Sequence, residues 1–146
     1  MRFFLILVLL GFSALTSFAD TFVPPPAFAD CSGIMISVDG PTLFFFLTVR
    51  RDGSASLAKA SMMDGICPAK TFEFQKIYED LSNHLEAKNN EQPFQYEICF
   101  YPANSHYVFP NGYINDKKII RDLFMTFKAH ASFGAKEDFE KLFPSD

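Results

Sequence analysis

The hydrophobic pattern of residues 34–60 predicts three consecutive β-strands. The run from Leu43 to Val49 is apolar at both odd and even positions up to Phe46, which predicts a central strand that is covered on both faces. A shorter apolar run occupies 34–38, and residues 54–60 alternate weakly between small and apolar side chains. Two turn signals separate the runs, Asp39-Gly40-Pro41 and Arg51-Asp52-Gly53. We therefore expect a three-stranded antiparallel meander.

A helical pattern follows the meander. Residues 61–70 carry the turn signals Asp64-Gly65 and Cys67-Pro68, and we expect a loop there. Thr71 is the expected N-cap of the helix, and Asn89-Asn90 is its expected end. Its apolar positions have helical spacing: Phe74, Ile77, Tyr78, Leu81 and Leu85. This spacing predicts an amphipathic helix with one buried face.

The pattern returns to strands after this helix. Apolar side chains alternate with Gln95, Glu97 and Cys99 over residues 94–100, which predicts a half-buried strand. A second strand over 106–109 is expected to pair back onto it. Turn signals bound this second strand at 102–105 and 110–112.

Two helices are expected to close the chain. Asn115 or Asp116 is the expected N-cap of the longer one, and Gly134 follows it in the position of a helix C-cap. The apolar face of this helix consists of Ile119, Ile120, Leu123, Phe124, Phe127 and Ala131. A short helix over 136–143 comes last, before Pro144.

The order of these elements is β-β-β-α-β-β-α-α, and it indicates the fold class. Helices that follow runs of strands pack best on one face of an antiparallel sheet. The sequence therefore predicts an α+β fold, with an antiparallel sheet of about four to five strands and two main helices packed on one face.

The first residues have the pattern of a secretory signal peptide. Arg2 supplies the positive charge, an apolar run follows from Phe3, and Ser17 and Ala19 are the small residues before a cut at Asp20. A second possible cut follows Ala29. We expect the first cut, because three prolines lie between the apolar run and the second. The alternative is an uncleaved leader that keeps the protein at the membrane as an envelope component.

The leader defines the expected organisation: a signal peptide at 1–19, a proline-rich N-terminal arm at 20–33, and a single α+β domain at 34–146. We expect a secreted or periplasmic protein. The chain carries a formal net charge of −4, which argues against nucleic acid as a partner. A membrane partner is expected only if the leader is retained.

Export also changes the expected state of the three cysteines. In an oxidising compartment, two of Cys31, Cys67 and Cys99 are expected to pair. Cys67–Cys99 is the pair we favour, since both residues lie within the folded region, and Cys31–Cys67 is the next candidate. The sequence does not decide between these pairs.

The sequence carries no recognisable catalytic or metal-binding motif. His84, His106 and His130 form no zinc-ligand spacing, and no cofactor or metal is expected. Cys99 and His106 could approach across the turn at 102–105, but a disulfide is the stronger expectation for that cysteine. We expect His84 and His130 to lie on the helix surfaces. The sequence does not decide whether the protein is an enzyme, and the lack of a catalytic motif argues against it.

The segment from Tyr101 to Tyr113 is unusually aromatic for a region of turns. It contains Tyr101, His106, Tyr107, Phe109 and Tyr113 among small polar residues. Tyrosine combines a large contact area with few rotatable bonds, and loops of this composition suit recognition. These five residues are the candidate binding residues, although inward packing of the aromatics is the alternative.

The leading functional hypothesis is an exported protein-binding module, such as a periplasmic inhibitor or an immunity-type protein. Export, small size and the aromatic segment all favour a protein partner. The second hypothesis is a small secreted hydrolase or ligand-binding protein that uses His106, which requires that this histidine line a concave pocket. The third is the membrane-tethered envelope component.

Overall fold

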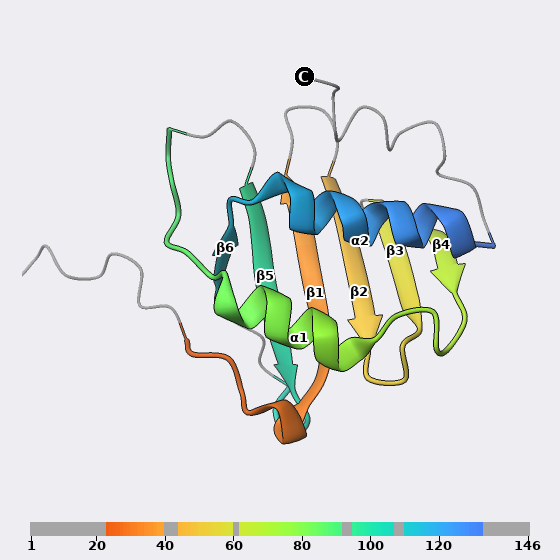
Figure 1. Ribbon diagram of the computed structural model, residues 1–146, viewed down its shortest axis with the longest axis horizontal. Coiled ribbons are helices and arrows are strands. Elements are labelled where there is room, and N and C mark those ends of the chain that lie inside the picture. The colour runs from red at the N-terminus through yellow and green to blue at the C-terminus, as the bar shows by residue number, and fades with distance from the viewer. Residues whose placement is uncertain (1–22, 40–43, 60–61, 92–94, 107–109, 133–146) are drawn as a thin grey trace, which may run out of the picture.

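A computed structural model of the chain describes residues 23–39, 44–59, 62–91, 95–106 and 110–132. It contains a six-stranded antiparallel sheet with two helices on one face (Figure 1). In chain order the elements are η1 (Phe28–Asp30), β1 (Cys31–Asp39), β2 (Phe44–Arg50), β3 (Ala55–Lys59), β4 (Met62–Cys67), α1 (Phe74–Asn83), β5 (Gln95–Pro102), β6 (Gly112–Ile114) and α2 (Lys117–His130). The predicted α+β class is confirmed, with six strands in place of four to five.

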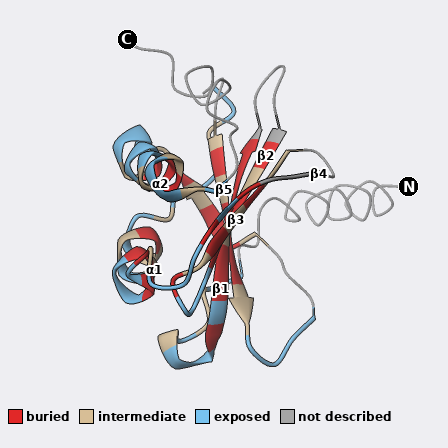
Figure 2. Cartoon of the chain, turned by 90° about the vertical axis from the view of Figure 1, so that its right-hand side faces the viewer, coloured by how far each residue is buried: buried red, intermediate tan, exposed pale blue. Residues whose placement is uncertain are grey.

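The sheet order is β4-β3-β2-β1-β5-β6, and every neighbouring pair is antiparallel. The predicted meander is confirmed as β1-β2-β3, and β2 is an interior strand as expected. Both helices cover the same face of the sheet (Figure 2). The core forms between that face and the helices, and its largest fully buried side chains include Phe45, Phe100, Phe124 and Phe127.

The opposite face of the sheet has no described helix over it, and we call it the open face. The strand registers place these described side chains on it: Met35, Ser37, Phe46, Thr48, Arg50, Ser56, Ala58, Ile66, Gln95, Glu97, Cys99, Tyr101 and Tyr113. The described helices cover one of the two faces of β2, and the predicted cover of its other face stays a prediction. Phe45, Leu47 and Val49 are buried under the helices, whereas Phe46 and Thr48 are only half-buried.

Two strands lie where turns or loops were expected. The segment 61–70 was expected to be a loop, but it contains β4. The strand pairs with β3 on both sides of Asp64, which is an extra residue between the pairs Leu57–Gly65 and Ala58–Met63. Asp64-Gly65 is thus part of a β-bulge, a feature that shares its composition with turns. The second strand is β6, which begins at Gly112 within the expected turn. Of the strand expected at 106–109, only His106 is described, outside any strand.

The first helix is shorter than its apolar pattern predicted. Thr71 is not its N-cap, because the Thr71 hydroxyl donates a hydrogen bond of 2.7 Å to the carbonyl of Pro68. The N-cap position is Glu73, and α1 ends at Asn83, before Asn89-Asn90. The chain then joins the sheet edge, where Glu86 and Tyr113 exchange two backbone hydrogen bonds of 2.8 and 2.9 Å.

The second helix follows its prediction closely. Asp116 is the N-cap, and its carboxylate accepts a hydrogen bond of 2.9 Å from the backbone nitrogen of Lys118. Such a cap satisfies a backbone donor that has no partner within the helix. The predicted apolar face is confirmed, with Ile120, Phe124 and Phe127 buried and the other three members packed at its margin.

One arginine of the domain makes several contacts with the N-terminal arm. A single guanidinium nitrogen of Arg51 donates to the carbonyls of Phe28, Ala29 and Cys31 at 2.7, 3.3 and 2.8 Å. The same guanidinium lies 4.6 Å from the centre of the Phe28 ring. β1 begins at Cys31, so the last three residues of the predicted arm belong to the sheet.

Several predictions lie outside the described residues. They are the leader over 1–19, Gly40-Pro41, Tyr107, Phe109 and the helix at 136–143. The expected C-cap at Gly134 is wrong, because α2 ends at His130 and Ala131 is its C-cap. In the described part of the chain, neither helix has the length and apolar character that a membrane span requires.

Candidate functional site

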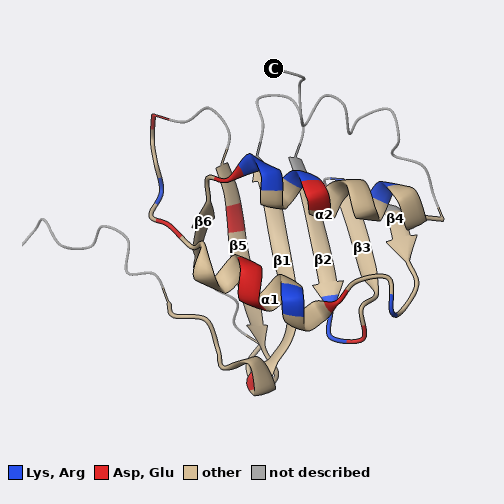
Figure 3. Cartoon of the chain, in the orientation of Figure 1, with Lys and Arg blue, Asp and Glu red and all other residues tan. Residues whose placement is uncertain are grey.

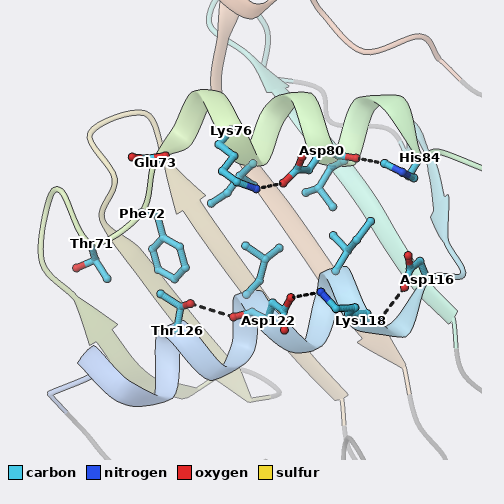
Figure 4. Close-up of a pocket in the computed structure, with 14 residues that line it drawn as sticks. Thr71, Phe72, Glu73, Lys76, Asp80, His84, Asp116, Lys118, Asp122 and Thr126 are labelled. Atoms are coloured by element: carbon cyan, nitrogen blue, oxygen red, sulfur yellow. Dashed lines mark hydrogen bonds and ion pairs between the residues drawn. The ribbon is translucent and has the colours of Figure 1, made fainter.

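The candidate site is a groove between α1 and α2, with a volume of about 520 Å³ (Figure 4). This is within the range of roughly 300–1,000 Å³ that ligand-binding clefts occupy. Its lining comes from both helices and from the segment before α1: Thr71, Phe72, Glu73, Lys76, Ile77, Asp80, Leu81, His84, Asp116, Lys118, Ile119, Asp122, Leu123 and Thr126. We call it the α1–α2 groove.

The floor of the groove is apolar. Leu81 is fully buried, Ile77 and Phe72 are 6% and 7% exposed, and Ile119 and Leu123 on α2 are half-buried. These side chains lie where the apolar stripes of the two helices approach each other above the sheet. The floor therefore offers a small hydrophobic contact surface that continues into the core.

The rims of the groove are charged, and each carries an ion pair. On α1 the Lys76 ammonium lies 2.5 Å from the Asp80 carboxylate, and on α2 the Lys118 ammonium lies 3.2 Å from Asp122. Both pairs have the i, i+4 spacing that brings side chains together on a helix. The hydrogen bond to Asp80 and its charge, together with the charges of Glu73 and Asp122, raise the pKa of Lys76. That lysine is therefore a stable cation within an acidic setting.

Acidic groups outnumber lysines around the groove. Glu73 and Asp116 occupy its two ends, in addition to the Asp80 and Asp122 of the ion pairs. Figure 3 shows that the charged residues of the domain gather on the helices and connecting segments, whereas the strands are almost uncharged. A ligand with apolar groups for the floor and positive charge for the rims matches this distribution.

The backbone before α1 fixes one end of the groove. Phe72 donates its backbone N–H to the carbonyl of Gly53 at 3.1 Å, and Lys70 donates to the carbonyl of Asp52 at 2.8 Å. The tight turn between β2 and β3 thus holds Phe72 in the floor. The predicted hairpin at Arg51-Asp52-Gly53 is confirmed, and it has this second role.

The predicted binding residues do not gather in the α1–α2 groove. Tyr101 and Tyr113 are half-buried on the open face, where the Tyr101 hydroxyl donates to the sulfur of Met35 at 3.2 Å. The Tyr113 hydroxyl donates to the carboxylate of Glu97 at 3.2 Å. His106 is exposed. Tyr107 and Phe109 lie outside the described residues, so the predicted aromatic surface is only partly visible.

The remaining histidines lie on helix surfaces, as expected. His84 and His130 are both exposed, and each ring bonds the carbonyl four residues earlier in its helix. His106 lines neither the α1–α2 groove nor a second hollow of about 510 Å³ between Phe28, Arg51 and α1. Within the described residues, no three histidine, cysteine or acidic side chains are grouped as metal ligands would be.

The fold does not bring the cysteines together, and all three are buried free thiols. Cys67 is part of the core under α2, whereas Cys99 lies on the open face of β5, four strand positions away. At about 4.8 Å per strand this separation is about 19 Å, far beyond the ~7 Å limit between the Cα atoms of a disulfide. Cys31 and Cys67 are three strand positions apart.

We therefore expect three protected thiols in the native protein. Burial raises the pKa of Cys31 and Cys67, and burial with the neighbouring Glu97 carboxylate raises the pKa of Cys99 to about 12. A thiol-specific chromogenic reagent at pH 8 should react with none of them within minutes, and with all three in denaturing guanidinium. Finding only one reactive thiol in non-reducing denaturant would contradict the structure and support a disulfide.

The α1–α2 groove was missed at the level of sequence for a physical reason. Its two ion pairs, Lys76–Asp80 and Lys118–Asp122, are separated by more than thirty residues along the chain. Each pair alone is typical of a solvated helix face. In the sequence, each ion pair borders the apolar stripe of its own helix. This pattern indicates a groove only once the two helices are known to lie side by side.

The chain was compared with protein-family models, with curated proteins and with solved structures, and none of the three comparisons gave a match.

Proposed function

We propose that the chain is an exported protein-binding module that receives a short, basic, amphipathic segment of another protein in the α1–α2 groove. The observation that carries this proposal is the combination of an apolar floor with acid-rich rims. Within the exported proteins, we propose an inhibitor or an immunity-type protein.

The dimensions of the groove support a peptide segment. α1 has ten residues, which corresponds to about 15 Å of helix. That length accommodates about two to three turns of a partner helix, whose apolar face would contact Ile77, Ile119 and Leu123. Helix-in-groove recognition of this type anchors apolar side chains at helical spacing.

The charges favour a basic segment. Lys76 and Lys118 are each already paired with an acid of their own helix, while Glu73 and Asp116 add negative charge at the ends of the groove. Lysine or arginine side chains of the partner would therefore meet a field of opposite sign. Such complementarity contributes mainly to specificity and to the rate of association.

The proposal predicts selective binding of a basic amphipathic peptide. The probe is a helical peptide of about twelve residues made of leucine and lysine, and its counterpart has glutamate in place of lysine. In NMR titrations the leucine–lysine peptide should shift the amide resonances of the groove, and the leucine–glutamate peptide should not. Shifts confined to other surfaces, or equal binding of both peptides, would contradict the proposal.

Two adjacent residues of α1 provide a matched pair of variants. Asp80 lines the groove, whereas Glu79 does not and instead accepts a hydrogen bond from Gln75. Asp80→Arg should weaken peptide binding at least tenfold, because it reverses a rim charge. Glu79→Arg makes the same change in net charge and should leave the dissociation constant within about twofold. Equal effects would indicate a general charge attraction.

A further inference from the structure

The arm that precedes β1 has the backbone of a polyproline II segment. Pro24, Pro25 and Pro26 fix their own φ at about −65°, and each proline also restricts the residue before it to extended backbone. The next residue, Ala27, has a φ of −55° and a ψ of 148°, close to the polyproline II conformation. Residues 23–27 belong to no helix or strand. They therefore lie against the domain as an extended segment.

Two side chains of the domain contact this segment with the spacing of a polyproline II helix. The Asn111 side-chain amide donates to the carbonyl of Val23 at 2.7 Å, and the Tyr78 hydroxyl donates to the carbonyl of Pro26 at 2.5 Å. A polyproline II helix has three residues per turn, so carbonyls three positions apart lie on the same side of it. One surface of the domain can therefore bind both carbonyls.

Contacts within the domain hold these two donors in place. The backbone N–H of Asn111 donates to the carbonyl of Ile98 at 2.9 Å, and the side-chain oxygen of Asn111 accepts the backbone N–H of Phe100 at 2.7 Å. Both partners belong to β5. The Tyr78 ring meets the Phe100 ring edge-on, with 5.4 Å between their centres. Both donors are thus pre-organised for carbonyls of a ligand, which lowers the cost of binding.

An aromatic contact follows the two carbonyl contacts along the arm. The Phe28 ring packs against Tyr78 and Phe74 of α1, with 5.3 and 6.1 Å between ring centres. The Arg51 guanidinium lies 4.6 Å from the centre of the same ring. We call the site formed by Arg51, Phe74, Tyr78 and Asn111 the arm seat. Proline-rich segments bind to aromatic-lined sites of this kind in other domains.

The arm offers the seat its main chain and one ring. The described hydrogen bonds from side chains of the seat to the arm all end on main-chain carbonyls, those of Val23, Pro26, Phe28 and Ala29. Such contacts specify an extended backbone and an aromatic side chain. A segment of another protein with the same backbone and the same aromatic spacing presents the same groups to the seat.

We propose that the arm seat binds proline-rich segments of other proteins, and that the arm is the intramolecular ligand that controls access to it. The segment has the pattern of 24–28, consecutive prolines with an aromatic residue two positions after the last. Tyr78 and Phe74 are not among the lining residues of the α1–α2 groove, so this site is separate from the groove. Because the arm is tethered, its effective concentration at the seat is about millimolar, and another segment must compete with it.

A peptide with the sequence of residues 20–30 is the probe, and the chain that begins at Asp20 is the protein tested. In the Phe28→Ala chain the arm lacks its ring, so the peptide should bind at least about tenfold more tightly than to the unchanged chain. NMR titration should shift the side-chain amide of Asn111 and the backbone amide of Tyr78. The absence of these shifts from both chains at about 5 mM peptide would overturn the proposal.

The backbone and the hydroxyl contact are tested separately. A peptide with alanine in place of the three prolines should bind at least about tenfold more weakly, because it must be ordered on binding. Tyr78→Phe keeps the ring and should weaken binding of the proline peptide by about threefold to tenfold. Ser82→Ala removes a hydroxyl of α1 that bonds the carbonyl of Glu79, and it should leave the affinity unchanged. Equal binding of the two peptides would contradict recognition of a polyproline II backbone.

The unchanged chain keeps the test valid if Phe28→Ala does not fold. At about 5 mM the proline peptide should displace the arm in part, and the amide resonances of 23–29 should move towards those of an unstructured segment. Arm resonances that do not move, in a chain that is folded by circular dichroism, would overturn the proposal. A dimer of the unchanged chain that the folded Phe28→Ala chain does not form would assign the seat to the arm of a second copy, which also overturns it.

Discussion

A chain that begins at Asp30 should be less stable than one that begins at Asp20 by about 3 to 5 kcal/mol. The two chains correspond to the two signal-peptide cuts that the sequence allows. Only the longer one keeps the segment 23–29, whose carbonyls and aromatic ring are engaged by the domain. The shorter chain should melt at least about 10 °C lower.

Two side-chain hydrogen bonds and one aromatic cluster explain the size of this effect. The side-chain amide of Asn111, which is only 6% exposed, donates to the carbonyl of Val23 at 2.7 Å. The Tyr78 hydroxyl donates to the carbonyl of Pro26 at 2.5 Å. A buried donor without its partner costs about 1–3 kcal/mol. The shorter chain also lacks the Phe28 ring, whose centre lies 6.1 Å from that of Phe74 and 5.3 Å from that of Tyr78.

Arg51 supplies a control within the longer chain. Arg51→Lys keeps the charge but cannot reproduce the interactions of the planar guanidinium with three carbonyls and the Phe28 ring. It should lose part of the stability that truncation removes, and its effect should be smaller in the chain that begins at Asp30, where Arg51 keeps only the Cys31 carbonyl of these partners. Both measurements use denaturant unfolding. Equal stability of the two chains would show that the arm is not an integral part of the domain.

This result would also bear on the maturation of the protein. A cut after Ala29 would remove Val23, Pro26 and Phe28 and leave Asn111 and Tyr78 without these partners. A cut after Ala19 keeps them. If the chain is exported as we propose, the interactions of the arm favour the first site, and N-terminal sequencing of the exported protein should find Asp20 as its first residue.

The local spacing of apolar residues was sufficient to predict the strands and helices that bury one face in the core. Tyr96, Ile98 and Phe100 alternate along β5 and are all buried, as expected. The apolar positions of α1 and α2 were also predicted, because a helix that covers a sheet must present one stripe to it. Asp116 was one of two predicted N-caps of α2, because a polar residue directly before apolar residues at helical spacing marks the start of a helix.

The features that were predicted wrongly depend on contacts between segments that are distant in the sequence. Asp64-Gly65 has the composition of a turn, and only its pairing with β3 makes it a bulge within a strand. Tyr101 and Tyr113 were chosen for their residue type, but their place on the open face follows from the register of β5 and β6.

Gly53→Ala should destabilise the protein by about 3 kcal/mol or more, the largest effect expected of a single methyl group outside the core. Gly53 has a φ of 80°, a conformation that favours glycine. A Cβ atom at this position would lie 2.5 Å from the carbonyl oxygen of Phe72 and 3.0 Å from the backbone of Lys70. Both contacts are with backbone, which cannot rotate away as a side chain would.

Gly53→Asn separates the two causes of this destabilisation. Asparagine tolerates a positive φ better than alanine does, but its Cβ would meet the same carbonyl of Phe72. If the backbone contact dominates, as we expect, Gly53→Asn should be about as unstable as Gly53→Ala. Ser54→Ala, at the next position of the same turn, is the matched control and should change stability by less than about 1 kcal/mol. A change below about 1 kcal/mol for Gly53→Ala would contradict the geometry of the turn.

The same substitution should also affect the α1–α2 groove. Gly53 accepts the backbone N–H of Phe72 at 3.1 Å, and Phe72 forms part of the groove floor. Moving the Phe72 carbonyl away from a new methyl group displaces that side chain from the floor. At a temperature where Gly53→Ala is still folded, it should therefore bind the leucine–lysine peptide more weakly than Ser54→Ala does. Unchanged peptide affinity in folded Gly53→Ala would show that binding does not depend on Phe72, and it would shift the site towards the His84 end of the groove.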